Sequence, residues 1–297
     1  MKLAEPTTRI AIKNILFATD FSIHSSAALV YARSIARRYG SKIHAVHVVT
    51  PSSYATVPPE LLGQAREEVM RSAKAQMRET DERLHGLSHA TAISEGDIWE
   101  ELSQIINQEQ IDLIVMGTHG RTGLTRMMMG SVAEEVYRQA MCPVLTVGPQ
   151  ASFSVPQEIE LKKILYATDF SRGAQAAAPY ALSLAQEHEA CLTLLQVVED
   201  KPQECVPNCE GMEASLRRRL LDMVPMGADS WCMPQAEVRY GDAAEQIVSM
   251  ASGWRADLVV MGVRKPSHPA LAPHLPGSVS SQVIAEAQCP VLTVRSR

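Results

Sequence analysis

The sequence lacks several features that would place it in a class at once. No apolar stretch approaches the roughly 20 residues that a membrane-spanning helix requires. It has no long run of lysine or arginine, the usual sign of a nucleic-acid-binding surface, and its net charge is −5 at pH 7. We therefore expect neither a membrane protein nor a nucleic-acid-binding protein.

Cysteine is also scarce. The 6 cysteines among 297 residues are too few for a disulfide-stabilised scaffold. Residues 1–9 carry charges and a proline but no apolar segment of the kind found in secretion signals. These observations predict a cytoplasmic protein with reduced thiols.

What the sequence does contain is an internal repeat. Three segments occur twice, in the same order and at a nearly constant offset: KNILFATDFS (13–22) and KKILYATDFS (162–171), DLIVMG (112–117) and DLVVMG (257–262), and CPVLTV (142–147 and 289–294). The length also suits two domains. We predict a duplicated domain, with copies at 1–150 and 158–297 and a linker near 149–160 that holds two prolines.

Within each copy, short apolar runs alternate with longer segments of helical periodicity. In the first copy we expect strands at 12–19, 43–49, 88–93, 111–116 and 144–147, and helices at 25–39, 60–84, after Asp97, and at 131–140. Asp97 followed by Glu100 is typical of a helix N-terminus. The alternation predicts an α/β fold of two tandem, doubly wound parallel sheets of the Rossmann-like type, which bind ligands beyond the C-terminal ends of their strands.

The loop after the fourth strand of the first copy has the most informative pattern. Gly117, Gly120 and the pair formed by Gly130 and Ser131 are separated by two and then nine residues, and the pair opens the next helix. Glycine lets the backbone approach a ligand, and a helix N-terminus favours a phosphate. The pattern is neither a P-loop nor a Gly-x-Gly-x-x-Gly fingerprint. A plain glycine-rich turn is the alternative.

These segments resemble the universal stress protein family. The run 116–133 and CPVL at 142–145 are similar to that family's signature, and 15–22 and 164–171 are similar to its first strand and the aspartate that follows. The resemblance covers nearly the whole chain twice. It implies a tandem member with two adenine-nucleotide-alpha-hydrolase-like domains, of which the first binds ATP. Mg²⁺ would enter with the nucleotide, since no dedicated carboxylate cage is evident.

The resemblance also implies which residues contact the nucleotide. Asp20 lies at the adenosine end, Val48 offers backbone contacts to adenine, and the loop glycines and Ser131 contact ribose and phosphates. The expected set is Ala18, Thr19, Asp20, Val48, Met116, Gly117, His119, Gly120, Arg121, Gly130, Ser131 and Val132. For Asp20 the alternative is a helix cap or turn residue. For His119 and Arg121 it is a solvated loop side chain.

The second copy departs from this pattern in its loop. Five positions still match: Asp169, Val197, Gly262, Gly277 and Ser278. Lys265 replaces the middle glycine, while two extra residues and four prolines lengthen and stiffen the loop. We expect this second site to be empty or weak. The alternative is that Arg264 and Lys265 bind phosphate through their side chains.

The leading hypothesis is a stress-response regulator in which ATP orders the loop between Gly117 and Gly130 and so changes a surface for an unidentified protein partner. The resemblance also implies that residues 144–147 pair with 291–294 across a pseudo-two-fold axis inside one chain, and that a further homodimer forms. His44 and His47 are expected on one face of the second strand, as hydrogen-bonded core or rim histidines rather than metal ligands.

Three other functions stay open. An ATP hydrolase or nucleotidyl-transfer enzyme would need a positioned base and a protein-held metal. No such constellation is evident, so we expect at most slow ATP hydrolysis. A zinc or redox sensor through Cys205, Cys209 and Cys232 has only one close cysteine pair, where structural zinc sites commonly have two. The third is an interaction module that has lost its nucleotide.

Overall fold

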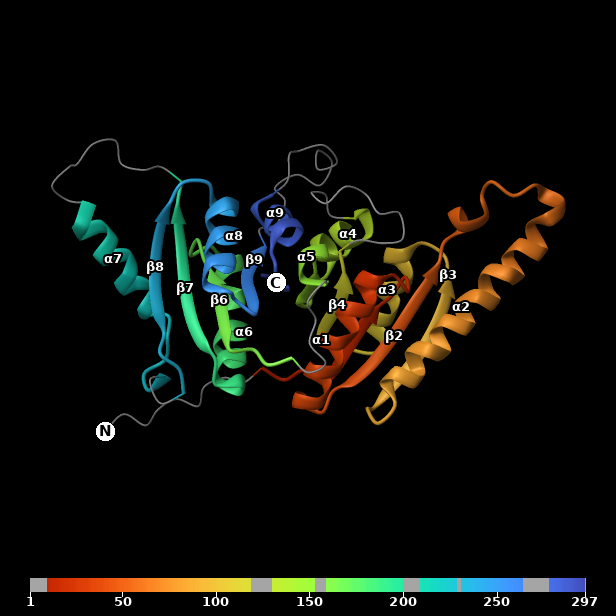
Figure 1. The fold of residues 1–297 in the computed structure, drawn as a ribbon, viewed down its shortest axis with the longest axis horizontal. Coiled ribbons are helices and arrows are strands. Elements are labelled where there is room, and N and C mark those ends of the chain that lie inside the picture. The colour runs from red at the N-terminus through yellow and green to blue at the C-terminus, as the bar shows by residue number, and fades with distance from the viewer. Residues whose placement is uncertain are drawn as a thin grey trace.

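A computed structural model of the chain describes residues 10–118, 130–152, 159–199, 209–228, 231–263 and 278–296. Within these residues the strands form one ten-stranded sheet in the order β3-β2-β1-β4-β5-β10-β9-β6-β7-β8, flanked by helices (Figure 1). All pairings inside each half are parallel. The predicted fold class, two doubly wound α/β units in tandem, is confirmed.

The two halves repeat the same order of elements. The first holds β1 (Asn14–Ala18), α1 (Ile23–Tyr39), β2 (Lys42–Val49), two short 3₁₀ turns (Pro51–Tyr54 and Pro59–Leu61), α2 (Leu62–Leu84), β3 (His89–Glu95), α3 (Ile98–Gln108), β4 (Leu113–Gly117), α4 (Ser131–Gln139), β5 (Val144–Val147) and α5 (Pro149–Ser152). The second holds β6 (Lys163–Ala167), α6 (Arg172–His188), β7 (Cys191–Val198), α7 (Cys209–Leu221), β8 (Gln235–Tyr240), α8 (Ala243–Trp254), β9 (Leu258–Val263), α9 (Val279–Glu286) and β10 (Val291–Arg295).

The sheet is buried on both faces, which explains why its strands are nearly continuous apolar runs. In β1, Ile15 and Phe17 belong to the core on the face covered by α1, α2, α6 and α7, while Leu16 belongs to the core on the face covered by α3, α4, α8 and α9. The arrows of β2 and β7 both end at the upper side of the molecule (Figure 1). The C-terminal strand ends of both halves therefore face the same side.

The repeated aspartate of the DLIVMG and DLVVMG segments has a structural role at the opposite edge. The Asp112 carboxylate accepts hydrogen bonds from the backbone nitrogens of Lys13 and Asn14, at 2.7 and 2.9 Å. Asp257 does the same for Lys162 and Lys163, both at 2.8 Å. Each aspartate thus fixes the start of the first strand of its half against the fourth.

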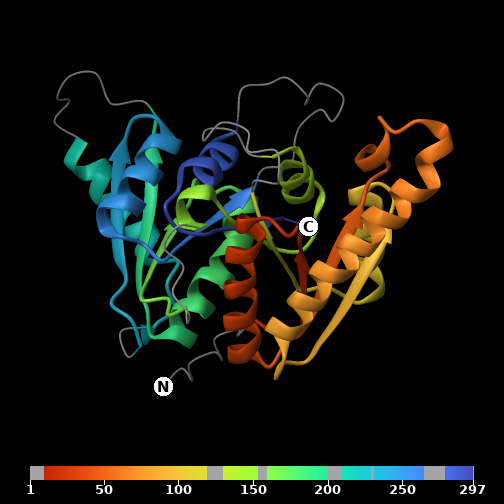
Figure 2. The ribbon, with the colours of Figure 1, turned by 45° about the vertical axis from the view of Figure 1, so that its right-hand side comes forward.

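The two halves join through β5 and β10, which pair antiparallel with Leu145 opposite Leu292. Two threonines reinforce this junction: the Thr146 hydroxyl donates to the carbonyl of Val291 at 3.1 Å, and the Thr293 hydroxyl to that of Val144 at 3.2 Å. The predicted pairing of 144–147 with 291–294 is confirmed. Figure 2 shows α1 and α6 side by side at the same junction, where their side chains line a shared apolar cavity.

The segment predicted as a linker begins with a short helix. Residues 149–152 form α5. Ala151 is buried in the core that contains α1, and proline is favoured in the first turn of a helix. None of the helices in the described part of the chain has the length and hydropathy needed to cross a membrane.

Candidate functional site

Among the residues that the structure describes, the predicted contacts of the first half lie on or near the C-terminal ends of β1, β2 and β4. β1 lies between the other two strands, with Ala18 opposite both Val46 and Met116. Ala18 and Val48 pack against the core on the α3–α4 face, as does Val132 at the start of α4. The site therefore lies at the end of the sheet that the fold class predicts.

Asp20 forms a tight turn directly after β1. Its Oδ1 accepts a hydrogen bond from the backbone nitrogen of Ser22 at 3.0 Å, and Phe21 between them has a φ of 63°. Ser22 in turn caps α1, since its hydroxyl oxygen accepts from the nitrogen of Ser25 at 3.2 Å. The turn role that was the alternative for Asp20 is thus observed. Asp169 makes the same turn in the second half, 2.9 Å from the nitrogen of Ser171.

His47 supports this turn from the neighbouring strand, a role that the sequence analysis missed. Its Nδ1 donates to the carbonyl oxygen of Thr19 at 2.8 Å, because a carbonyl oxygen only accepts. Its ring centroid lies 4.4 Å from that of Phe21. The ring thus braces both ends of the segment that carries Asp20.

His44 does not share a face with His47, so the expectation of one common face is wrong. Residues three apart in a strand point to opposite sides of the sheet. His44 is buried; its Nδ1 lies 3.6 Å from a carboxylate oxygen of Glu109 and its Nε2 lies 3.4 Å from the side-chain oxygen of Asn14. Burial, with a smaller contribution from Lys42, lowers the pKa of His44, while Glu109 raises it.

The residues on either side of the loop after β4, Thr118 and Gly130, are hydrogen-bonded to each other. The backbone nitrogen of Gly130 donates to the carbonyl oxygen of Thr118 at 2.8 Å, and Thr118 is held to β5 by a bond from its nitrogen to Val147, at 3.1 Å. The predicted contacts His119, Gly120 and Arg121 belong to the segment 119–129, outside the described residues.

The two helices that follow the loops begin differently. Helix α4 has Gly130 at its N-cap, a residue with no side chain to cap the helix, and Ser131 is exposed. Helix α9 is capped by Ser278, whose hydroxyl oxygen accepts from the nitrogen of Ser281 at 3.2 Å. Uncapped N–H groups at a helix start carry partial positive charge and suit an anion. At α4 the N-cap glycine has no side chain to bond these N–H groups, whereas at α9 the Ser278 hydroxyl accepts from the N–H group of Ser281.

Gly117 is explained by packing. A Cβ there would lie 2.9 Å from the carbonyl carbon of His24 and 3.0 Å from the nitrogen of Ser25 in α1. At Gly262 in the second half, a Cβ would come within 2.1 Å of the backbone of Gly173. Close approach of helix to strand requires glycine at both places. Contact of Gly117 with ribose or phosphate stays a prediction.

The second half keeps the turn after its first strand, but its helix α9 is capped by Ser278. Asp169 follows β6, and Val197 of β7 packs against the same core face as Val48. Ser278 lies at the junction between the halves. Lys265, Arg264 and Gly277 lie outside the described residues, so the role of the lysine stays a prediction.

The zinc hypothesis stays untested, because Cys205 lies outside the described residues and the side chain of Cys209 is not described. Within the part of the chain that the structure describes, no three His, Cys, Asp or Glu side chains gather where they could hold a metal ion. Cys232 and Cys289 are buried, as small apolar side chains would be.

Comparison with known proteins assigns the chain to a family. The model of the universal stress protein family matches residues 11–148 and again 160–295, far more than half of the sequence. This chain belongs to the universal stress protein family, as a tandem member with two such domains. The boundaries 1–150 and 158–297 stay predictions.

Individual relatives agree with this assignment. Universal stress protein MJ0531 of Methanocaldococcus jannaschii is 35% identical over 143 residues, which cover 46% of this chain and 81% of that protein. The crystal structure of a universal stress protein from Archaeoglobus fulgidus covers 96% of this chain and 98% of its own, with 19% identity and a TM-score of 0.67, and shows the same fold. Another solved universal stress protein, in complex with cAMP, covers 47% of this chain and 100% of its own, with 21% identity and a TM-score of 0.38.

Proposed function

We propose that this chain is a nucleotide-dependent regulator of the stress response whose first half binds one ATP. The observation that carries the proposal is the start of α4, where Gly130 closes the loop on Thr118 and, as the N-cap residue, has no side chain of its own to cap the helix. Such a helix start favours the negative charge of a phosphate. A cytoplasmic location and a protein partner that responds to ATP occupancy are parts of this proposal.

The donors and acceptors present fit an adenine nucleotide. The first N–H groups of α4 would hold phosphate oxygens, and the Asp20 carboxylate would accept from hydroxyl groups of the ribose. A Cβ at Gly130 would lie 2.9 Å from the carbonyl oxygen of Thr118, so this position admits glycine alone without a backbone shift. Mg²⁺ would be held mainly by the phosphates, as is usual for this ion.

The second half is proposed to be silent toward ATP. Its helix α9 is capped by Ser278, which therefore competes with a phosphate for the same N–H group. Asp169 preserves the turn after β6, so the loss is confined to the phosphate end. We expect one ATP per chain.

The experiment that tests the proposal is isothermal titration calorimetry of nucleotide-free protein with Mg-ATP, which measures the affinity and the number of sites. Asp20→Asn and Asp169→Asn form a matched pair of variants. Asparagine keeps an acceptor for the turn in both variants. Loss of a charged partner weakens binding by roughly tenfold or more, so we expect that loss in Asp20→Asn alone. Two equal sites would contradict the silent second half, and no uptake of ATP at all would overturn the nucleotide proposal.

A further inference from the structure

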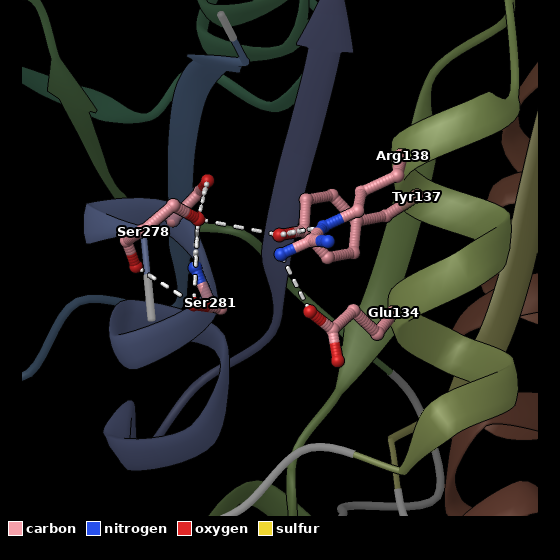
Figure 3. A network of polar contacts seen from close by, with 6 residues as sticks. Glu134, Tyr137, Arg138, Ser278 and Ser281 are labelled. Carbon is pink, nitrogen blue, oxygen red and sulfur yellow. Dashed lines mark hydrogen bonds and ion pairs between the residues drawn. The ribbon is translucent and has the colours of Figure 1, made fainter. Parts of the chain in front are cut away.

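A polar contact joins the helix of the first candidate site to the helix of the second. The hydroxyl of Tyr137, in α4, lies 3.2 Å from the hydroxyl of Ser278, the N-cap of α9 (Figure 3). Tyr137 is buried, with 2% of its surface exposed. The two residues are 141 positions apart in the sequence. The contact therefore exists only because the two halves share one sheet.

The Ser278 hydroxyl takes part in several polar contacts. It lies 3.1 Å from the Ser280 hydroxyl and 3.3 Å from the Ser281 hydroxyl, and the Ser281 hydroxyl donates to the carbonyl oxygen of Ser278 at 2.8 Å. In the contact between Tyr137 and Ser278 either hydroxyl can be the donor. Arg138 completes the series, because its Nε donates to the Tyr137 oxygen at 3.5 Å.

The same stretch of α4 is held to the second half by its backbone. The guanidinium of Arg295, at the end of β10, donates to the carbonyl oxygen of Arg138. The Arg138 side chain is itself anchored by Glu134, with 2.6 Å between Nη2 and Oε1 (Figure 3). Residues of the second half thus fix α4 at its C-terminal turn, while its N-terminal turn faces the candidate phosphate position.

The contact between α4 and Ser278 has no counterpart between α9 and Ser131. Aligning GSVAEEVYR at 130–138 with GSVSSQVIA at 277–285 makes Ser278 the counterpart of Ser131 and Ile284 the counterpart of Tyr137. Isoleucine has no hydroxyl, so the reciprocal bond from α9 to Ser131 cannot form. Ser131 is left exposed at the start of α4, while Ser278 is used by the other half.

We propose that Ser278 is a positioning residue for the first-half site and acts through Tyr137. This inference rests on the proposed function. A helix is a rigid rod, so fixing Tyr137 fixes the direction of the N–H groups at Gly130. A site held in its binding geometry before the ligand arrives binds more tightly than one that must be ordered. The serine of the second half that corresponds to Ser131 thus supports the first-half site through its contact with Tyr137, and we call this contact the brace.

The test uses four single variants and one double variant, Tyr137→Phe with Ser278→Gly, in titrations with Mg-ATP. Tyr137→Phe removes the tyrosine hydroxyl alone. Ser278→Gly removes its partner hydroxyl while keeping a residue that is tolerated at an N-cap, and Ser278→Thr keeps the hydroxyl. Tyr166→Phe is the matched control, because it deletes a buried tyrosine hydrogen bond, 2.6 Å to the carbonyl of Ala174, away from α4.

We expect Tyr137→Phe and Ser278→Gly each to weaken ATP binding by roughly two- to tenfold, the range of one lost hydrogen bond. The double variant should bind no more weakly than either single one. Ser278→Thr and Tyr166→Phe should bind like the unmodified protein. Unchanged affinity in Tyr137→Phe, or a second ATP gained by that variant, would overturn the positioning role.

A second readout keeps this inference separate from the proposed function. If the unmodified protein takes up no ATP, the proposed function fails, and the brace is judged by amide hydrogen exchange in residues 131–139 without nucleotide. Faster exchange in Tyr137→Phe than in Tyr166→Phe would support it. Equal exchange in the two variants would overturn it.

Discussion

The backbone nitrogen of Gly130 lies 2.8 Å from the carbonyl oxygen of Thr118, so one hydrogen bond closes the loop and also sets the start of α4. We expect the candidate site to depend on this bond.

Gly130→Ala should disrupt the loop closure. The added Cβ would meet the Thr118 carbonyl oxygen at 2.9 Å, and relief of such a clash costs about 1–3 kcal/mol of stability. We expect lower stability in urea and loss of ATP binding. The control is Gly63→Ala in α2, where no atom lies within 4 Å of the new Cβ and stability should rise by up to about 1 kcal/mol. Gly130→Ala with unaltered ATP affinity would argue against the role of this bond.

The paired strand-end glycines should differ in their tolerance of a methyl group. At Gly262 a Cβ would lie 2.1 Å from the carbonyl carbon of Gly173, whereas at Gly117 the shortest contact is 2.9 Å, to His24. We expect both alanine variants to unfold at lower urea concentration, by about 1–3 kcal/mol for Gly117→Ala and more for Gly262→Ala. Gly253→Ala, in α8 with nothing within 4 Å of the new Cβ, is the control and should not lose stability. The reverse order of stability would show that α6 moves more easily than α1.

Stability should fall as the pH is lowered from 7 to 5.5. Burial lowers the pKa of both His44 and His188 in the folded chain. The unfolded histidines, with pKa values near 6.5, then bind protons that the folded ones resist. Their contribution is fully present above pH 6.5 and is lost as the pH falls toward the folded pKa. Denaturant unfolding at a series of pH values measures the slope.

His44→Gln isolates one part of this effect. The variant has no imidazole to protonate, so its unfolding free energy should fall less steeply between pH 7 and 5.5 than that of the unmodified chain. His85→Gln serves as the control for the substitution itself, because the His85 side chain is exposed. Identical slopes for all three proteins would contradict the assignment to His44.

Two cysteines should differ in reactivity. Burial, followed by Asp257, raises the pKa of Cys289 to about 12, whereas Cys191 is exposed at the start of β7. The thiolate is the reactive form, so iodoacetamide should modify Cys191 first in the folded protein. Peptide mapping by mass spectrometry follows both sites, and denaturant should remove the difference. Equal rates in the folded chain would mean that Cys289 is not buried as described.

Local sequence signals were reliable where the governing interactions are local. Asp97 caps α3, with its Oδ1 accepting from the nitrogen of Glu100 at 3.0 Å, and α4 begins at Ser131. The strand at 144–147 has the expected bounds, and its pairing partner in β10 followed from the family resemblance. Repetition of whole segments made the tandem organisation visible without any structural information.

Features that depend on distant contacts were missed. The contact of Tyr137 with Ser278 joins residues 141 positions apart and leaves no periodic or local pattern. The α5 helix is stabilised by burial of Ala151, which a proline-containing segment does not reveal. His44 and His47 face opposite sides of the sheet, because side chains three positions apart in a strand alternate. The bond of His47 to Thr19 depends on strand order, which the sequence does not state.

The antiparallel junction of β5 and β10 has a consequence for how the protein responds to dilution. When two separate chains share such a junction, it forms only above their dissociation constant. Here the two strands belong to one polypeptide, so the connecting chain sets a constant effective concentration. Each first half always has a second half beside it, at any expression level, and the second half can serve it as a permanent subunit.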